Sequence, residues 1–207
     1  HASAQEKVHA QAWVIGPGRG TGPEAAAELS AVLKLGLPTI IDADALTVLS
    51  TYGDLRELVR DHPCAVLTPH AGEFERLYKA TLGRELDLSE GLEICLQELA
   101  SALDCFVLHK GRITTVTGPD QDIYGMNAGH SYAATAGSGD VLSGILGATL
   151  AQLDAAEADA EAIIMEILHA AAIHQHAAAI AAHTPDGFGL CSASQIAASV
   201  PQAIARL

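Results

Sequence analysis

Basic residues are scarce in this chain of 207 residues. It contains 11 lysines and arginines against 25 aspartates and glutamates, which gives a formal net charge of −14. A surface of that sign repels polyanions, so the balance argues against nucleic acid or an anionic membrane as a partner. A phosphorylated ligand would have to be held by local features, because the field of the whole molecule repels it.

Long apolar runs and paired cysteines are also missing. No signal peptide opens the sequence, and no uncharged apolar run reaches the roughly 18 residues that suggest a membrane-spanning helix. The four cysteines form no Cys-x-x-Cys pair, and Cys64 and Cys105 lie in apolar, strand-like runs. This favours reduced core thiols over disulfides or zinc ligands. A cytoplasmic location is therefore expected.

Several common nucleotide and nucleophile motifs fail on spacing. The segment Gly16-Pro17-Gly18-Arg19-Gly20 suggests a dinucleotide fold, but a third glycine of G-x-G-x-x-G is missing, because positions 21 and 23 are threonine and proline. The sequence contains neither a P-loop motif nor a G-x-S-x-G nucleophile elbow. A glycine-rich loop near a ligand and a plain flexible turn both remain open for residues 16–22.

Short apolar runs alternate with helical patterns along the chain. This alternation predicts an α/β fold with a parallel sheet covered by helices on both faces. A hairpin signature at 113–126 adds an antiparallel excursion. We expect a single domain over residues 1–207, with strands at 12–15, 38–42, 65–68 and 106–108. The expected helices are at 23–36, 44–51, 54–61, one that begins within 69–74, 89–103 (capped by Ser89), 139–152, 156–182 and 192–206.

The stretch 132–145 is the main functional candidate. Small and turn-forming residues lead into a helix that starts near Ser138 or Gly139, and the first amides of a helix bind anions well. We therefore predict an anion hole formed by Gly137, Ser138 and Gly139. Asp140 lies in the first helical turn, where it could take a proton from a hydroxyl that attacks a phosphate. An ordinary capped helix with an acid in its first turn is the alternative.

Other polar residues follow predicted strands, where ligand chemistry concentrates in parallel sheets. We expect one crevice to gather the glycine-rich loop 16–20, Asp42, His70 and Lys110-Gly111 around Gly139 and Asp140. His70 could instead cap a helix, and Lys110 could be a solvated turn residue.

Histidines recur every seven residues in the late helix, at His169, His176 and His183. Side chains at this spacing share a helix face but lie about 10 Å apart, which is too far to share one metal. We expect a polar stripe against another helix or subunit, and no metal ligands among the protein residues. Self-association into a homo-oligomer, such as a tetramer, is expected.

Four motifs together resemble the ADP-dependent (S)-NAD(P)H-hydrate dehydratases of the ribokinase-like superfamily. They are IGPGRG at 15–20, IDADAL at 41–46, LTPHAGEF at 67–74 and ATAGSGDVLSG at 134–144. The resemblance implies a ribokinase-like three-layer sandwich. It also implies that hydrated NADH or NADPH (NAD(P)HX) is phosphorylated on its ring hydroxyl by ADP or ATP with Mg²⁺, and then loses phosphate to restore the cofactor.

The resemblance also implies roles for individual residues. Gly20, His70 and Asp140 would bind the hydrate, with Asp140 as the catalytic base. The nucleotide would be bound by a loop and one glycine, Lys110, Gly111, Arg112, Ile113, Thr114 and Gly139. His174 occupies the place of a family histidine and is expected to be structural.

The sequence differs from the family pattern in two places, and two other functions remain open. The family has a further strand–helix segment before Trp13, so we expect this chain to lack an N-terminal part of the domain. Arg112 and Ile113 replace smaller residues. Another ribokinase-like kinase acting on a vitamin-precursor alcohol, or a non-catalytic nucleotide-binding relative, would also carry the site around Gly139.

Overall fold

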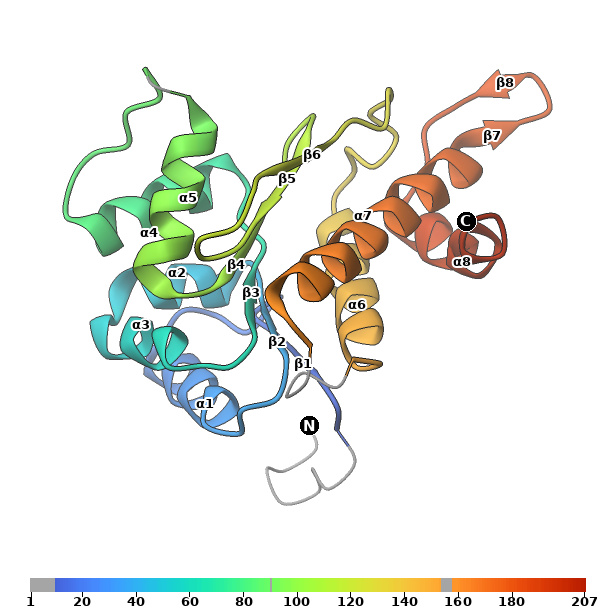
Figure 1. Cartoon of the computed structure of the whole chain (residues 1–207). Coiled ribbons are helices and arrows are strands. Elements are labelled where there is room, and N and C mark those ends of the chain that lie inside the picture. Colours follow the sequence, from blue (N-terminus) through green and yellow to red (C-terminus); the bar gives the residue numbers. More distant parts are fainter. Residues whose placement is uncertain (1–9, 90, 154–157) are drawn as a thin grey trace.

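The fold is built on a six-stranded sheet in the order β1-β2-β3-β4-β5-β6 (Figure 1). The computed structural model describes residues 10–89, 91–153 and 158–207. Strands β1–β4 pair in parallel, and β5 pairs antiparallel with both β4 and β6, which agrees with the predicted antiparallel excursion. The strands are β1 (Trp13–Ile15), β2 (Thr39–Ile41), β3 (Ala65–Leu67), β4 (Phe106–His109), β5 (Thr114–Thr117) and β6 (Tyr124–Met126).

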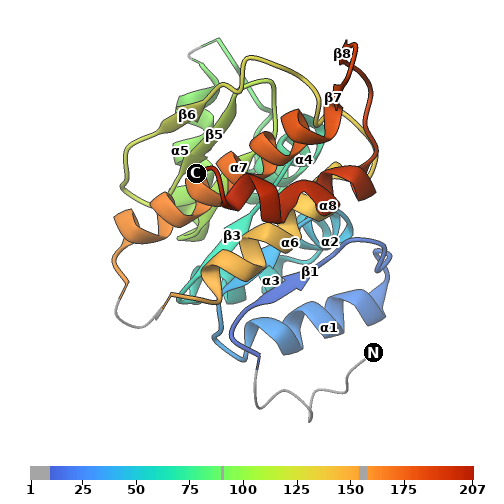
Figure 2. The same cartoon turned by 90° about the vertical axis from the view of Figure 1, so that its right-hand side faces the viewer.

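Helices cover both faces of the sheet and make three layers. One face carries α1 (Pro23–Leu33), α2 (Asp44–Thr51), α3 (Gly53–Arg60), α4 (Ala71–Leu82) and α5 (Leu92–Leu103). The other carries α6 (Ser138–Leu150), α7 (Ala160–Ala182) and α8 (Ala193–Ile204), as Figure 2 shows from the side. The predicted α/β class is confirmed.

The apolar strands divide their side chains between these two layers. Ile41 and Leu67 belong to the core under α1–α5, whereas Ile40 and Val66 belong to the core under α6–α8. All four side chains are fully buried. Successive residues of a strand point to opposite faces, so a strand covered on both faces has a continuous apolar run.

Two local predictions differ from the structure, and one hairpin was not predicted. Helix α5 begins at Leu92 with Gly91 as its N-cap, while the Ser89 amide donates to the carboxylate of Asp87. Helix α7 begins at residue 160 with Asp159 as its cap, and residues 156 and 157 of the predicted helix lie outside the described residues. A small hairpin of β7 (His183–Thr184) and β8 (Gly187–Phe188) was not predicted.

Helix α7 is long and apolar enough to cross a bilayer by length and composition alone. Half of this stretch is buried inside the protein. The helix packs against α6, α8 and β5. Its apolar composition is thus explained by its place in the core.

The end of β1 lies very close to the end of β2. The Asp42 amide donates to the Ile15 carbonyl at 3.0 Å. Gly16 has φ +126°, and a Cβ at this position would lie 1.8 Å from the Asp42 carbonyl oxygen. Only glycine fits there, so Gly16 fixes the path of the β1–α1 loop beside the end of β2.

Candidate active site

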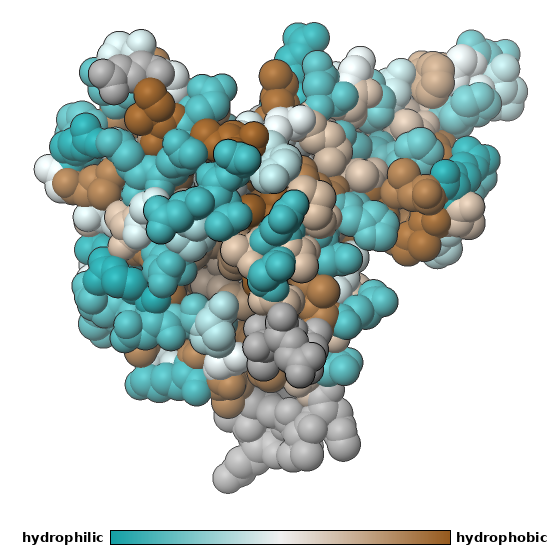
Figure 3. Space-filling view, viewed as in Figure 1, coloured by the Kyte–Doolittle hydropathy of each residue, from teal (hydrophilic) through white to brown (hydrophobic). Residues whose placement is uncertain are grey.

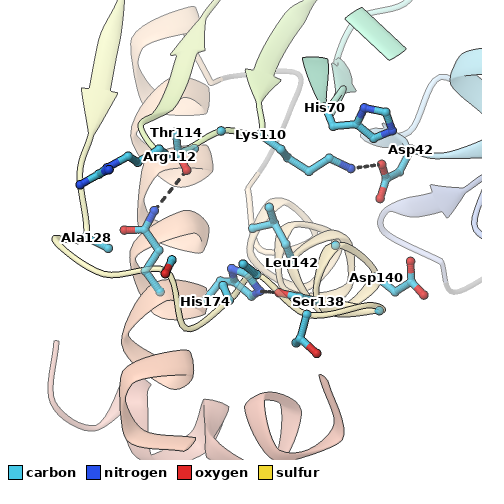
Figure 4. Close-up of a pocket in the computed structure, with 18 of the residues that line it drawn as sticks. Asp42, His70, Lys110, Arg112, Thr114, Ala128, Ser138, Asp140, Leu142 and His174 are labelled. Atoms are coloured by element: carbon cyan, nitrogen blue, oxygen red, sulfur yellow. Dashed lines mark hydrogen bonds and ion pairs between the residues drawn. The ribbon is translucent and has the colours of Figure 1, made fainter. Parts of the chain in front are cut away.

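A pocket of about 900 Å³ opens where the carboxyl ends of the parallel strands meet the start of α6 (Figure 4). Of the residues predicted to converge, Asp42, His70, Lys110 and Asp140 all line it. The loop 16–20, which was predicted to join them, supplies none of the lining residues. Most of the other predicted site residues line it as well, namely Gly111, Arg112, Thr114, Gly137, Ser138 and Gly139.

Two predicted site residues lie elsewhere. Gly20 is not among the lining residues, and its amide donates to the Asp44 carboxylate at 2.8 Å. Ile113 is 51% exposed and packs beside Gly125, away from the lining. Their assigned roles in substrate and nucleotide binding stay predictions.

Asp42 is the central side chain of the pocket floor. It is 1% exposed, and its Oδ1 accepts from Lys110 Nζ at 2.6 Å and from the Ala43 amide at 2.8 Å. Its Oδ2 accepts from the hydroxyl of Ser143, a fully buried residue of α6, at 2.7 Å. Asp42 thereby ties β2, the end of β4 and α6 together. The position of Asp42 after an apolar strand signals a site residue, but no sequence pattern indicates its partner Ser143.

Lys110 is held at the start of α6 by this ion pair, so it is not a solvated turn residue. Its side chain is 22% exposed, and its backbone amide donates to the Pro69 carbonyl at 2.8 Å. A Cβ placed on Gly139 would lie 3.6 Å from Lys110 Nζ. The absence of a side chain at Gly139 therefore leaves the ammonium group open to the first turn of the helix.

The first turn of α6 is also where backbone donors are available. Gly137 is the N-cap in a left-handed conformation, with φ +82°. The Ser138 amide donates to the Thr135 carbonyl at 3.2 Å, so it is already engaged. Within the described ranges, the amides of Gly139 and Asp140 have no backbone carbonyl partner. Of the predicted anion site, the Ser138 amide is therefore taken, whereas the amides of Gly139 and Asp140, beside the exposed Asp140 carboxylate, stay open to an anion.

His70 caps helix α4, which confirms the capping interpretation. Its Nδ1 accepts from the amides of Gly72 and Glu73, and the Glu73 carboxylate accepts from the His70 amide in return. The ring stays 56% exposed at the edge of the pocket. Glu73 is buried and lies 4.0 Å from Lys110 Nζ, so it adds to the negative charge around that ammonium group.

Two neighbours on α7 reach the pocket from the opposite side. His174 Nε2 lies 2.9 Å from Ser138 Oγ, and Gln175 Nε2 donates to Thr114 Oγ1 at 3.1 Å. Burial lowers the pKa of His174 to about 4, so the ring is neutral at pH 7. Sequence analysis predicts only a structural role for His174 and no role for Gln175.

The profile of one protein family, described as NAD(P)H-hydrate dehydratase, matches residues 1–196. The chain belongs to this family. Among curated members, the bifunctional NAD(P)H-hydrate repair enzyme Nnr of Corynebacterium glutamicum is 44% identical over 95% of the chain and 37% of its own length. The ADP-dependent (S)-NAD(P)H-hydrate dehydratase of Neisseria meningitidis is 38% identical over 72% of the chain and 50% of its own length. The chain therefore spans half or less of these two relatives.

Solved structures agree on the fold of this NAD(P)H-hydrate dehydratase family member. A ribokinase-like superfamily protein from Enterococcus faecalis superimposes with a TM-score of 0.73 at 24% identity, covering 95% of the chain and 63% of that protein. An ADP/ATP-dependent NAD(P)H-hydrate dehydratase from Bacillus subtilis, co-crystallised with ATP/Mg²⁺, gives 0.70 at 23% identity, with coverages of 95% and 64%. These likenesses confirm the predicted fold, a three-layer sandwich of the ribokinase-like type.

Proposed function

We propose that the protein is an ADP-dependent dehydratase that repairs hydrated NADH and NADPH. The damaged nicotinamide ring carries a hydroxyl group, and hydroxide is a poor leaving group. Transfer of a phosphoryl group to this hydroxyl makes phosphate the leaving group instead. The family membership supports the substrate, and the pocket supports the chemistry.

The observation that carries the proposal is the position of Asp140 beside the open amides of α6. The carboxylate would take the proton of the ring hydroxyl while that oxygen attacks the terminal phosphorus of ADP. A bond forms between the ring oxygen and phosphorus as the bond to the AMP oxygen breaks, so AMP leaves. The Gly139 and Asp140 amides and Lys110 would stabilise the charge on the transferring group. Loss of phosphate and of a ring proton then restores the double bond.

Magnesium would enter this site mainly with the nucleotide. No group of three or more His, Cys, Asp or Glu side chains able to hold a metal exists within the described part of the chain. Of the carboxylates in the lining, Asp42 already accepts three hydrogen bonds, which leaves Glu73 and Asp140 as the better placed to supply one or two oxygens. Mg²⁺ binds in this way, through one or two carboxylates and the phosphates. When bound, it would neutralise the diphosphate.

The cellular setting and assembly belong to the same proposal. All four cysteines are free and buried, which supports a reducing, cytoplasmic environment.

His169 and His176 are exposed on α7, whereas His183 lies beyond the helix in β7, so the predicted histidine stripe keeps two members. Apolar side chains gather over the C-terminal helices in Figure 3, where Ile204 is 54% exposed. We propose self-association through this region; a monomer in light scattering at micromolar concentration would count against it.

The test is recovery of reduced nicotinamide absorbance when hydrated NADH is incubated with ADP and Mg²⁺. Asp140→Asn is expected to lower turnover by about 10²- to 10⁴-fold, the usual contribution of a general base, while the Kd for ADP changes little. Asp54→Asn is the matched control, because Asp54 is an exposed acid in the first turn of α3, outside the pocket.

Two outcomes would contradict the proposal. Folded protein that gives no recovery, but phosphorylates a vitamin-precursor alcohol with ATP, would indicate a small-molecule kinase. Protein that binds ADP without any turnover would indicate a non-catalytic relative. Unchanged turnover in Asp140→Asn would remove Asp140 from the role of base.

A further inference from the structure

Two consecutive residues of α7 connect the two walls of the pocket. His174 meets Ser138, which is in the first turn of α6, and Gln175 donates to Thr114, which begins β5. Figure 4 shows both hydrogen bonds on one side of the pocket, with Lys110 and Asp42 across from them. Consecutive helix residues point about 100° apart, so one helix turn can reach two separate elements.

Three of the four groups in these two contacts are buried, and the fourth, Gln175, is partly exposed. Exposed fractions are 4% for Ser138, 7% for His174 and 8% for Thr114. Both α7 residues also line the pocket. A buried hydroxyl that loses its partner is left unsatisfied, so each contact restrains the element it reaches.

The charge of its side chain does not explain the role of His174 in the pocket. Its ring is neutral at pH 7, so it adds no cationic attraction for a phosphate, and it adds no proton donor beyond the N–H of the neutral ring. The contact with Ser138 can therefore act through geometry alone, by holding the first turn of α6 in place.

We propose that His174 and Gln175 are positioning residues that fix the nucleotide loop and the start of α6 relative to each other. The inference rests on the proposed function, in which Lys110 and the Gly139 amide act on the same nucleotide. His174 orients the turn that presents the Gly139 amide, and Gln175 orients the loop that ends at Thr114. The loop that ends at Thr114 and the first turn of α6 are then already correctly placed when a nucleotide binds. Less of the binding free energy is used to order them.

The test is a pair of double-mutant cycles on ADP binding, measured by calorimetry with Mg²⁺ and without hydrate. His174→Ala and Ser138→Ala are each expected to raise the Kd for ADP by about 3- to 10-fold, the range for one hydrogen bond, and the double variant to match either single variant. Gln175→Ala and Thr114→Val should behave in the same way. His174→Gln, which can return a polar group near the Nε2 position, should recover most of the affinity.

His176→Ala is the control on the same helix, because His176 is exposed and outside the pocket lining. A Kd for ADP that is unchanged in the four single variants would overturn the positioning role while leaving the proposed function intact. Additive effects within each pair, or an equal effect of His176→Ala, would overturn it as well. If His174→Ala does not fold, Ser138→Ala and His174→Gln decide the question. A wild-type protein that binds no ADP would overturn both the proposed function and this inference.

Discussion

The ion pair between Lys110 and Asp42 should respond asymmetrically to loss of its two members. Asp42 is 1% exposed, whereas the Lys110 side chain is 22% exposed at the pocket. An ammonium group at the pocket wall can turn toward water when its partner is neutralised. A carboxylate on the pocket floor cannot, so removing the lysine should cost more than neutralising the aspartate.

The structure sets the size of this difference. Removing one partner of a buried pair costs about 3–5 kcal/mol, and Lys110→Met should be near the lower end, at about 3 kcal/mol, because Ser143 and the Ala43 amide still donate to Asp42. Asp42→Asn should lower the free energy of unfolding by about 1–2 kcal/mol, since the unpaired ammonium group of Lys110 is partly exposed and the amide oxygen can still accept from Ser143. For a chain of this size each kcal/mol lowers the Tm by about 2–4 °C.

Equilibrium unfolding in urea at pH 7 measures these free energies. Lys79→Met is the matched control, because Lys79 pairs with Glu85 on the surface and such pairs contribute about 0–1 kcal/mol. The double variant Asp42→Asn/Lys110→Met should be more stable than Lys110→Met alone, since the unpaired carboxylate is gone. The reasoning is refuted if Lys110→Met is no less stable than Asp42→Asn or Lys79→Met.

Two further predictions concern the backbone and pH. Gly16→Ala should lower the free energy of unfolding by at least ~4 kcal/mol, because its Cβ would lie 1.8 Å from the Asp42 carbonyl oxygen. Gly18→Ala should lower it by only about 1–2 kcal/mol, because Gly18 has φ +66° but open space around it. Thermal unfolding of both variants measures the difference. His174 has its pKa lowered from 6.5 to about 4, so the unfolded chain gains its proton first and stability falls as pH drops through that window. The expected loss is about 3 kcal/mol between pH 7 and pH 4, and the His174→Gln variant should not show it. If the free energies of unfolding in urea fall in parallel for the wild-type protein and this variant, the lowered pKa of His174 is contradicted.

The architecture could be predicted because its signals are local. Ile40 and Ile41 are both fully buried, one against each helical layer. A strand that is covered on both faces therefore appears in the sequence as a continuous apolar run, without alternating polar residues. The small hairpin at His183 gave no comparable signal, since its strands have two residues each and exposed side chains. The cap of α5 was misplaced because a serine resembles a cap more than glycine does, while Gly91, with φ +108°, holds that position through its backbone.

The site could be predicted only as far as strand ends and helix starts allow. A parallel sheet brings the residues after its strands to one edge, so Asp42, His70 and Lys110 could be placed together without knowing their contacts. The partners Ser143 and Gln175 could not, because each is one polar residue on a helix whose rotation against the sheet decides which element it meets. Such pairings require the three-dimensional arrangement of α6 and α7.

The charge balance of the pocket explains how an acidic protein can hold a diphosphate. Of the described lining residues, Lys110 and Arg112 carry cationic side chains, and Asp42 already neutralises the lysine. His174 is neutral, and the molecule as a whole carries −14. Anion binding must therefore rely on directional donors, the amides of α6 and the ammonium hydrogens not used by Asp42, together with a cation that arrives with the nucleotide. Directional donors act only at correct distances, which is why the contacts of Asp42 and Ser138 that fix the start of α6 matter as much as the groups that would touch the phosphate.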